Sequence, residues 1–583
     1  MFKFTQNNHI VVILAIFSAL LITNKSISQN LPVGLTPQEK LVMPEYLKTI
    51  QNKGITNPPS SSVRTAAEWE EIDALTITWT SYTSVLAQIV KYAQMECKVI
   101  INCSDSNSVK TYLTSQGIPI TNVAFIIAPF NSVWIRDYGA QNVYTHEVDS
   151  LLLIDWVYNR PRPKDDTIAR ALSKFTGLPL YETSGLNQLI NTGGNFMADG
   201  FGNAFSSNLV VDENPTLTAS QIDTIMKKYM GLNRYVHMPN LPYDGIHHID
   251  MHMKLLNEET LLVGQYPTGT ADGPQIESNL QYILQNYNSV FGTPYKVVRI
   301  PMPPDNLNNN QFPNQNGDYL TYTNSVFVNK TVLVPTYYEK YDTTALKIYR
   351  EALPGYKIVG INCSSTIPAS GAIHCITNSV ASNDPILISH QQLQDVFGVK
   401  GPLDFDAKIL HRTGIQSATL YYRWDTTQAY IAKPMSCIDT INNIWRGNLA
   451  SYPNGPARIY YYIKAISNSG KTQVRPISAP QGNFSLFVNL SSIDEYTSNI
   501  SMTSIYPNPT NGILNFEIES AVPQNVAISI YSIFGQKLVE VYQGRIISGK
   551  TDFTYNIESL SSGVYLIRTE SGANSTIRKF IKE

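Results

Sequence analysis

The sequence predicts an α/β domain over residues 63–398, followed by two smaller all-β units. In the first region, short apolar runs such as Leu75–Trp79 and Leu151–Ile154 alternate with amphipathic stretches such as Ser84–Met95, the alternation typical of an α/β fold. Beyond about residue 400 this helical periodicity disappears, and tyrosine-rich runs with strand character replace it. The 35 Tyr, 33 Gly and 33 Pro among 583 residues indicate a strand-rich and loop-rich protein and not a helical bundle.

The first 28 residues have the order of segments found in a secretory signal peptide. Lys3 precedes the apolar run His9–Ile22, and the small-residue site Ser26-Ile27-Ser28 follows ahead of Gln29. The apolar run is shorter than the roughly 20 residues that a membrane-spanning helix needs. We therefore expect residues 1–28 to be removed on export. The next segment, residues 29–62, is polar and proline-rich and is predicted to be a propeptide or linker.

Two all-β units are expected at the carboxyl-terminal end. Residues 399–492 contain the strand-like runs Ala418–Trp424 and Ala457–Ala465 and a turn at Asn468–Lys471, which predicts a small β-sandwich. Residues 500–583 again combine short strands, such as Ala527–Tyr531, with turn residues. We expect this last segment to be a separate small β unit.

Charge and cysteine content narrow the possible functions. The net charge is −2, which gives no electrostatic reason to expect binding to nucleic acid or to an anionic membrane. The chain has five cysteines, and a regular strand between Cys97 and Cys103 would hold them about 20 Å apart, too far for a disulfide. We therefore expect no disulfide framework. An odd count leaves at least one free thiol, which is either a nucleophile or, more commonly, a buried inert cysteine.

Polar residues that are costly to bury gather in five segments, each of which follows or interrupts an apolar strand. This is the usual place for a functional site on an α/β scaffold. The segments are Trp134–Gly139, Tyr158–Pro163, Thr192–Phe196, His247–His252 and Ile373–Asn378.

The histidine-rich segment allows three interpretations. In an extended strand His248, Asp250 and His252 would project from one face, and three such ligands could hold zinc. Alternatively, the segment is a solvated loop without a role. In the third interpretation His248 is a general acid and base, and Asp250 anchors a substrate.

Cys375 lies in a strand-like run after the small residues Ser370–Ala372. In a strand the adjacent His374 would face away from it, which makes His374 a poor partner. A remote histidine could activate the thiol, because nucleophile and base need only be close in space.

Taken together, the segments resemble the guanidine-modifying (pentein) superfamily, in its agmatine deiminase and bacterial peptidylarginine deiminase branch. The order and spacing of the motifs over roughly 330 residues are far more specific than any one motif. The matching positions are Trp134-x-Arg136-Asp137-x-Gly139 for the Trp-x-Arg-Asp-x-Gly signature, Gly193-Gly194-Asn195 for the Gly-Gly-Asn turn, His248-x-Asp250 for the catalytic His-x-Asp, Asn324 for a site-lining asparagine, and Ile373-His374-Cys375 for the nucleophile.

Within this branch the segment Asn159–Pro163 resembles the secreted, Porphyromonas-type peptidylarginine deiminases. The resemblance implies that Arg160 and Arg162 hold the terminal carboxylate of a peptide substrate, whereas agmatine has no carboxylate. Arginine suits this role because its fork of donors matches a carboxylate. The alternative is that Arg160, Arg162 and Lys164 form a solvated surface cluster.

The resemblance also implies a fold, a reaction and a destination. The fold is a five-bladed α/β propeller followed by an immunoglobulin-like domain and a type IX secretion sorting domain. The reaction converts arginine, in peptides and at their carboxyl termini, into citrulline without a metal or other cofactor. Cys375 is the nucleophile, His248 the acid and base, and Asp137 and Asp250 the guanidinium anchors, with Asn324 also catalytic. Trp134, Gly194 and Asn195 line the substrate site beside the arginine pair. The implied partners are peptide substrates and the type IX machinery at the outer membrane, and not nucleic acid, and the location is secreted or at the cell surface.

Three other functions compete with this one. The first is an agmatine deiminase or another small-guanidine hydrolase that uses the same site. The second is a zinc hydrolase built on His248, Asp250 and His252, which would leave Asp137, Arg160 and Cys375 without a role. The third is a non-catalytic surface adhesin, since exported β-sandwich proteins often only bind.

Overall fold

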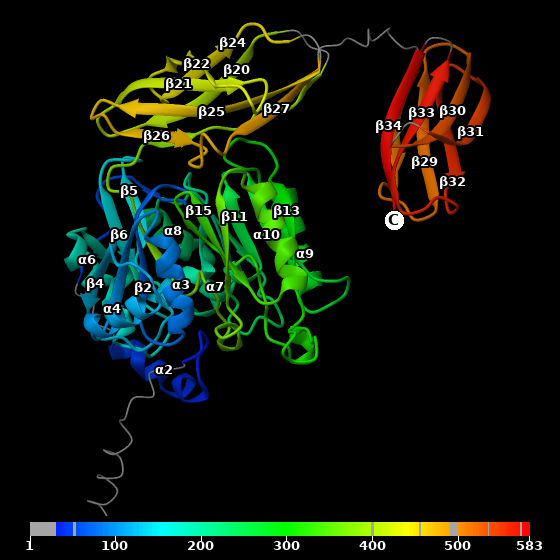
Figure 1. The fold of residues 1–583 in the computed structure, drawn as a ribbon. Coiled ribbons are helices and arrows are strands. Elements are labelled where there is room, and N and C mark those ends of the chain that lie inside the picture. The colour runs from blue at the N-terminus through cyan, green and yellow to red at the C-terminus, as the bar shows by residue number, and fades with distance from the viewer. Residues whose placement is uncertain are drawn as a thin grey trace, which may run out of the picture. The chain divides into compact units, whose positions relative to one another are not determined.

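The structure, a computed structural model, describes residues 31–49, 54–397, 401–453, 456–489, 500–533, 536–571 and 574–583. The expected signal peptide lies outside the described residues. None of the described helices is long and apolar enough to cross a membrane. The contacts divide the chain into two compact units (Figure 1). The first holds the described residues up to Gln394 with Pro402–Ser451 and Arg458–Leu486, and the second holds Asp395–Gly401, Tyr452–Ala457 and Phe487–Glu583.

The α/β domain is built from five small sheets among the described residues, and four of them repeat one pattern. In each of the four, a pair of antiparallel strands is followed by a helix and then by a strand parallel to the second one. The pairs and their helices are β5 and β6 with α6 and β7, β8 and β9 with α8 and β10, β11 and β12 with α9 and β13, and β14 and β15 with α10 and β16.

The fifth sheet joins the two ends of this domain. Its strands β2, β3 and β4 run parallel, and α3 and α4 connect them. The antiparallel partner of β2 is β17, the last strand of the domain, so the sheet pairs strands from the two ends of the domain sequence. Because β17 comes directly after Cys375, this closure brings the nucleophile candidate next to the first strand of the domain.

The strand bounds of the domain are as follows: β1 Val63–Thr65, β2 Ile72–Thr78, β3 Lys98–Cys103, β4 Val123–Ile127, β5 Gln141–Thr145, β6 Leu151–Asp155, β7 Leu180–Glu182, β8 Met197–Ala198, β9 Asn203–Ser207, β10 Arg234–Met238, β11 Met253–Asn257, β12 Thr260–Gln265, β13 Lys296–Pro301, β14 Val326–Val328, β15 Thr331–Thr336, β16 Lys357–Asn362 and β17 Asn378–Ala381. The helices are α2 Pro37–Thr49, α3 Thr83–Ala93, α4 Ser106–Ser115, α5 Ile135–Tyr138, α6 Ile168–Thr176, α7 Leu209–Asp212, α8 Ala219–Met230, α9 Gly273–Asn286 and α10 Glu339–Ala352.

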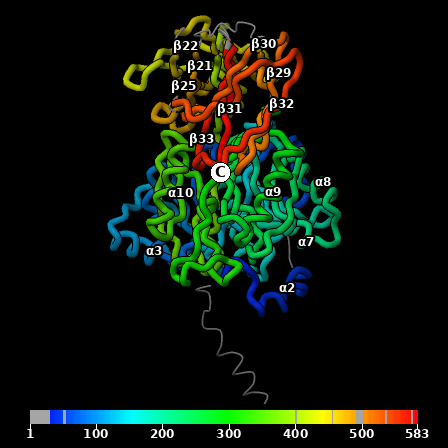
Figure 2. Tube along the Cα trace, turned by 90° about the vertical axis from the view of Figure 1, so that its right-hand side faces the viewer, coloured from blue at the N-terminus to red at the C-terminus, as the bar shows by residue number. Residues whose placement is uncertain are grey.

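The longer helices lie on the outside of the strands, with α3 and α8 on opposite sides of the domain in Figure 2. Each turns one apolar face inward, as in α3, where Val85, Leu86 and Ile89 are buried and Lys91 is exposed. Strands inside the sheets, such as β2 and β6, are buried over almost their whole length, because helices or other strands cover both faces. This arrangement explains why the sequence shows continuous apolar runs at the strands and not strict alternation.

The β-sandwich follows in the first unit. One sheet has the order β18-β20-β24-β23, and the other contains β27-β25-β21-β22, with β26 paired to β25. Its first strand, β18, precedes the expected boundary at residue 399. The strand bounds are β18 Leu387–Ser389, β19 Val396–Phe397, β20 Leu403–Leu410, β21 Ile415–Arg423, β22 Ile431–Pro434, β23 Ser436–Asp439, β24 Ile444–Leu449, β25 Ala457–Ser467, β26 Thr472–Arg475 and β27 Phe484–Asn489.

The carboxyl-terminal segment is all-β, as the sequence predicts. It forms two sheets around a small core that includes Phe516, Ile528 and Phe580. Its strands are β28 Ile500–Tyr506, β29 Ile513–Ser520, β30 Gln524–Ser532, β31 Lys537–Ile546, β32 Gly549–Asn556, β33 Gly563–Ser571 and β34 Asn574–Lys582. All five cysteines of the chain are free, so no disulfide links any of these parts.

Candidate active site

Cys375 lies in a tight turn, residues 373–376, immediately before β17. The strand that the sequence analysis assumed around Cys375 is therefore wrong, because the chain turns there before it enters the sheet. The thiol is fully buried, and the Asn324 Nδ2 group donates a hydrogen bond to its sulfur over 3.2 Å. The backbone N–H of His374 donates to Asn324 Oδ1 over 3.0 Å, which fixes the orientation of this amide. Burial, together with the charges of Asp250 and Asp137, raises the pKa of the Cys375 thiol well above its usual value.

His248 and Asp137 face each other, and the charge of Asp137 acts on the Cys375 thiol. His248 precedes the short 3₁₀ turn Ile249–Met251, and Asp137 lies in the one-turn helix α5. Their Nδ1 and Oδ1 atoms are 3.7 Å apart, and neither ring nitrogen of His248 has a hydrogen-bond partner among the described residues. Burial lowers the pKa of His248, so the ring is neutral at neutral pH. A buried imidazole without partners is available to exchange a proton with a substrate.

The glycine turn before β8 packs directly against this pair. Gly194 donates its backbone N–H to Asp137 Oδ1 over 3.2 Å, and a Cβ atom at this position would lie 2.4 Å from His248 Nδ1. Only glycine therefore fits. The next residue, Asn195, accepts the backbone N–H groups of Ser207 and Ile249, so it fixes the chain beside His248 and does not point its amide at the thiol.

Asp250 completes the group of residues around Cys375. Its Oδ2 atom lies 3.8 Å from Cys375 Sγ and accepts a hydrogen bond from His374 Nδ1 over 2.7 Å. Its Oδ1 atom has no hydrogen-bond partner among the described residues. An unpartnered carboxylate oxygen near a buried thiol is the arrangement that a cationic substrate group would satisfy.

The zinc interpretation does not fit this geometry. Ile249–Met251 form a 3₁₀ turn, so His248, Asp250 and His252 do not project from one face of a strand as that reading required. In the described part of the chain, no group of three His, Cys, Asp or Glu side chains is placed to hold a metal ion.

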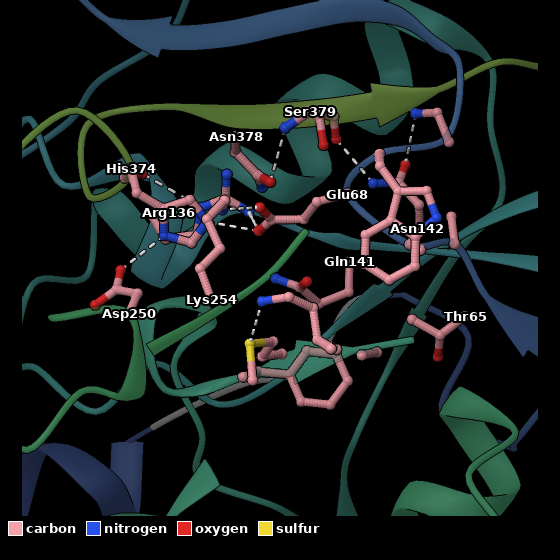
Figure 3. A pocket seen from close by; sticks show the side chains of 18 of the residues that line it. Thr65, Glu68, Arg136, Gln141, Asn142, Asp250, Lys254, His374, Asn378 and Ser379 are labelled. Atoms are coloured by element: carbon pink, nitrogen blue, oxygen red, sulfur yellow. Dashed lines mark hydrogen bonds and ion pairs between the residues drawn. The ribbon is translucent and has the colours of Figure 1, made fainter. Parts of the chain in front are cut away.

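A second set of charges, which the sequence analysis missed, lies behind Asp250. Figure 3 shows His374 with Asp250 and Glu68, and with Arg136 and Lys254 close by. His374 Nε2 is 2.5 Å from Glu68 Oε1, and Lys254 Nζ is 2.5 Å from Glu68 Oε2. No sequence pattern distinguishes Glu68, since Glu70 and Glu71 are equally polar neighbours. The signal for His374 was its position beside Cys375, and the assumption of a strand led to its rejection.

The arginine pair is buried and does not form a solvated surface cluster. Arg160 and Arg162 are 4% and 1% exposed. Both contact residues 31–39: Arg160 Nε donates to the Val33 carbonyl over 2.8 Å, and Arg162 pairs with the Glu39 carboxylate through Nε and Nη2 over 2.8 and 3.1 Å. Trp134 joins the same contact, because its indole N–H donates to the Leu31 carbonyl over 2.7 Å.

Comparison with known proteins identifies the family. A family model described as Porphyromonas-type peptidyl-arginine deiminase matches residues 64–380, which is more than half of the chain. The chain belongs to this family. It is therefore a hydrolase of the deiminase class, acting on C–N bonds of amidines, and the expected resemblance is confirmed.

Curated relatives of this deiminase are named for a small substrate. Proteins described as "Putative agmatine deiminase" from Vibrio parahaemolyticus and Legionella pneumophila are each 25% identical, over 291 and 314 residues. These alignments cover 45% and 51% of this chain and 78% and 84% of the relatives. An X-ray structure described as a "putative agmatine deiminase" is 18% identical, with a TM-score of 0.51 over 57% of this chain and all of that one, and it shows the same mixed α/β fold.

A second family model, described as a secretion system C-terminal sorting domain, matches residues 504–583. This deiminase is therefore a secreted or cell-surface protein, as the sequence predicts.

Proposed function

We propose that this deiminase hydrolyses the guanidinium group of arginine at the carboxyl terminus of peptides and releases citrulline and ammonia. The observation that carries the proposal is the position of the buried Cys375 thiol between Asn324 and the Asp250 carboxylate, whose second oxygen, Oδ1, has no partner among the described residues. A guanidinium ion carries N–H donors on every side of a central carbon, so it matches carboxylates that flank a nucleophile.

Asp137 and Asp250 would bind the guanidinium from two sides. Each offers an oxygen close to the site, and both come from short helical turns that are fixed by other hydrogen bonds. Two negative charges compensate the cost of burying the cation, and they orient its central carbon toward the sulfur of Cys375.

The reaction would proceed through a covalent thiouronium intermediate. The Cys375 thiol first gives its proton to the neutral His248 ring, and the resulting thiolate attacks the central guanidinium carbon to form a C–S bond. A C–N bond then breaks as protonated His248 passes that proton to the departing ammonia. His248 then takes a proton from water, whose oxygen attacks the same carbon. The C–S bond breaks, the sulfur leaves as thiolate, and the product is citrulline.

The substrate would supply the charge that ionises the nucleophile. In the free enzyme the raised pKa of Cys375 keeps the thiol protonated, since Asp250 and Asp137 oppose a third negative charge. A guanidinium ion bound between the two carboxylates reverses this local charge. The amide of Asn324, 3.2 Å from the sulfur, then donates to the thiolate.

Arg160 and Arg162 would hold the substrate's terminal carboxylate. Arg162 already makes a paired contact with a carboxylate, that of Glu39, which supports this role for its guanidinium. Arg160 is placed close enough to His248 for its charge to lower the pKa of that ring. Trp134 and Gly194 would complete the wall between this pair and the catalytic residues.

The architecture supports a propeller fold for the catalytic part. The five small sheets, closed by the pairing of β17 with β2, would be the five blades. The sandwich would be an immunoglobulin-like domain, and residues 500–583 would be recognised by a type IX secretion machinery and then removed.

The competing function is that of an agmatine deiminase, which the names of the curated relatives favour. Citrulline-type product formation measured on free arginine, agmatine, and peptides with terminal or internal arginine separates the two. We expect the peptide with carboxyl-terminal arginine to have the highest kcat/KM. If agmatine were the best substrate, the proposed specificity would be wrong.

A further inference from the structure

Two carboxylates, one histidine and two cations form a continuous chain behind the proposed guanidinium site. His374 lies between Asp250, at 2.7 Å from Nδ1, and Glu68, at 2.5 Å from Nε2. Glu68 in turn pairs with Lys254 and lies 3.5 Å from Arg136 Nη1. The residues come from four parts of the chain, since Glu68 precedes β2, Arg136 is in α5, Asp250 follows His248, and Lys254 is in β11.

The two carboxylates hold the imidazole ring of His374 from both ends. Each ring nitrogen lies within hydrogen-bonding distance of one carboxylate oxygen, so the ring is fixed between Asp250 and Glu68. Burial would raise the pKa of Glu68, but the charges of His374, Lys254 and Arg136 hold it well below its usual value, so Glu68 stays ionised.

We propose that His374 and Glu68 are positioning residues for Asp250, an inference that rests on the proposed role of Asp250 in binding guanidinium. His374 fixes Asp250 Oδ2 and so leaves Oδ1 free to accept from the substrate. Glu68 holds the His374 ring in this orientation through its contact with Nε2. Neither residue touches the reacting atoms.

Glu68 can be tested separately because it borders a pocket that does not contain the nucleophile. The lining of this pocket includes Glu68, Arg136, Lys254, His374 and Asp250, and it does not include Cys375, His248 or Asp137. The Glu68 side chain is 29% exposed. Glu68→Gln therefore removes a charge at nearly constant volume, at a distance from the nucleophile.

The first test compares two replacements of His374. Asn places an amide donor near the position of Nδ1, whereas Leu removes both donors. We expect kcat/KM of His374→Leu to fall about ten- to a hundred-fold, the size of one lost charge-assisted hydrogen bond, and His374→Asn to recover part of it. His237→Asn, at a second histidine–carboxylate pair formed with Asp223, is the matched control and should leave kcat/KM unchanged. Equal activities of folded Asn and Leu variants would overturn the proposal.

The second test is the split between KM and kcat in Glu68→Gln. The substitution replaces a charge-assisted hydrogen bond to His374 Nε2 by a neutral one, so Asp250 is held less firmly for the substrate guanidinium. We expect KM to rise about ten-fold while kcat and the thermal midpoint change little. Lys254 and Arg136, which contact Glu68, and Cys375, which follows His374, are unchanged in this variant. An unchanged KM, or activity that falls only in step with thermal stability, would overturn the positioning role of Glu68. Wild-type turnover tests the proposed function by itself, so the two failures are distinguishable.

A different observation concerns residues 31–49, which lie over the proposed substrate side of the site. Val33 is fully buried, its N–H donates to the Ala369 carbonyl, and its own carbonyl accepts from Arg160. Arg162 Nη2 donates to the carbonyls of Pro32 and Gly34. Cys375, His248 and Asn324 are 0% exposed in the chain that carries this segment.

Glu39 is the polar centre of this contact. Thr36 and Glu39 form a reciprocal capping pair at the start of α2: the Thr36 N–H donates to Glu39 Oε2 over 2.9 Å, and the Glu39 N–H donates to Thr36 Oγ1 over 3.2 Å. The cap holds the Glu39 carboxylate against the fork of Arg162 donors. No side chain of α2 is fully buried, but Tyr46 is half-buried, and its burial and the charges of Asp166 and Asp165 raise its pKa.

We infer that residues 31–49 are an intramolecular inhibitor, in which the Glu39 carboxylate occupies the place of the substrate's terminal carboxylate. The inference rests on the proposed role of Arg162. The segment lies at one end of the α/β domain (Figure 1). Its removal by proteolysis would open the site.

Cleavage tests the inference on the full chain. A recognition sequence for a specific protease, introduced between Thr49 and Gly54, allows the same protein to be assayed uncut and cut. We expect kcat/KM on a peptide with carboxyl-terminal arginine to rise at least about ten-fold on cutting, and Glu39→Gln to raise it in the uncut chain. Glu45→Gln, at an exposed ion pair with Lys48 in the same helix, is the control and should change nothing. Equal activity before and after cutting and release would overturn the inference.

A synthetic peptide of residues 30–49 gives a test that does not need turnover. It should bind the cut and separated enzyme in calorimetry and compete with substrate, and the Glu39→Gln peptide should bind about ten-fold more weakly or worse.

Burial opposes ionisation of Glu39, but the hydrogen bonds and charge of Arg162 and the Thr36 N–H lower its pKa below 4.5. A lowered pKa means that this contact stabilises binding above pH 4.5 and is lost as the pH falls below it. A peptide affinity that changes neither with Glu39→Gln nor with pH would contradict the role of Glu39. If the peptide bound as expected but no substrate gave citrulline, the proposed function would fail and the docking would stand.

Discussion

Cys375→Ala is expected to abolish citrulline formation, with a fall in kcat/KM of about 10⁴-fold or more, because the covalent route has no substitute nucleophile. The other cysteines cannot replace it: Cys97, Cys103 and Cys363 are buried elsewhere in the apolar core, and Cys437 is exposed in the sandwich. The measurement is citrulline release from a peptide with carboxyl-terminal arginine, with the enzyme freed of residues 31–49.

The matched control for this experiment is Cys437→Ala, which should keep wild-type activity. Circular dichroism and the thermal midpoint establish that the Cys375→Ala protein is folded, and a small effect on stability is expected since the thiol makes few polar contacts. Substantial turnover by folded Cys375→Ala protein would show that the mechanism does not use this thiol.

Motif order in the sequence predicted the residues around the thiol, and the structure brings these residues together. Asp137, His248, Asp250, Asn324 and Cys375 come from segments up to about 240 residues apart, yet each follows a strand end or lies in a short turn. Their chemistry is visible in sequence because charged and polar residues interrupt apolar runs. Their catalytic roles stay predictions until variants are assayed.

Local conformation was harder to predict than residue identity. The segments around Cys375 and Asp250 were assumed to be strands, but they form a turn and a 3₁₀ turn. The difference decides the role of His374, since strand alternation would direct it away from the site, and the turn instead places its ring on Asp250. Side-chain direction in such short runs depends on tertiary contacts and not on apolar periodicity.

The repeated architecture and the docked segment were also invisible in the sequence. The four similar strand–helix units share a pattern of pairing and not of residues, and their loops differ in length, so no period appears. The polar, proline-rich composition of residues 29–62 predicts a propeptide or linker, without saying where it docks. Their contact with Arg162 depends on one carboxylate, Glu39, which composition cannot single out.

A peptide that ends in free arginine is expected to be a far better substrate than its amidated twin, once residues 31–49 have been removed. Amidation removes the negative charge and one acceptor while the guanidinium end is unchanged. The buried arginines then lose a charge-assisted contact worth about 1.5–3 kcal/mol, which is roughly a ten- to 150-fold loss in kcat/KM at about 1.36 kcal/mol per tenfold.

Replacing Arg160 and Arg162 together by alanine should lower kcat/KM for the free-acid peptide and reduce the difference between the two peptides. Agmatine, which has no carboxylate, should be a poor substrate of the wild type and should change little in the double variant. Lys164→Ala, an exposed cation in the same loop, is the control and should leave the ratio of the two peptides unchanged. If amidation made no difference to the wild type, Arg160 and Arg162 would serve only to hold the N-terminal segment, and the enzyme would not select for a carboxyl terminus.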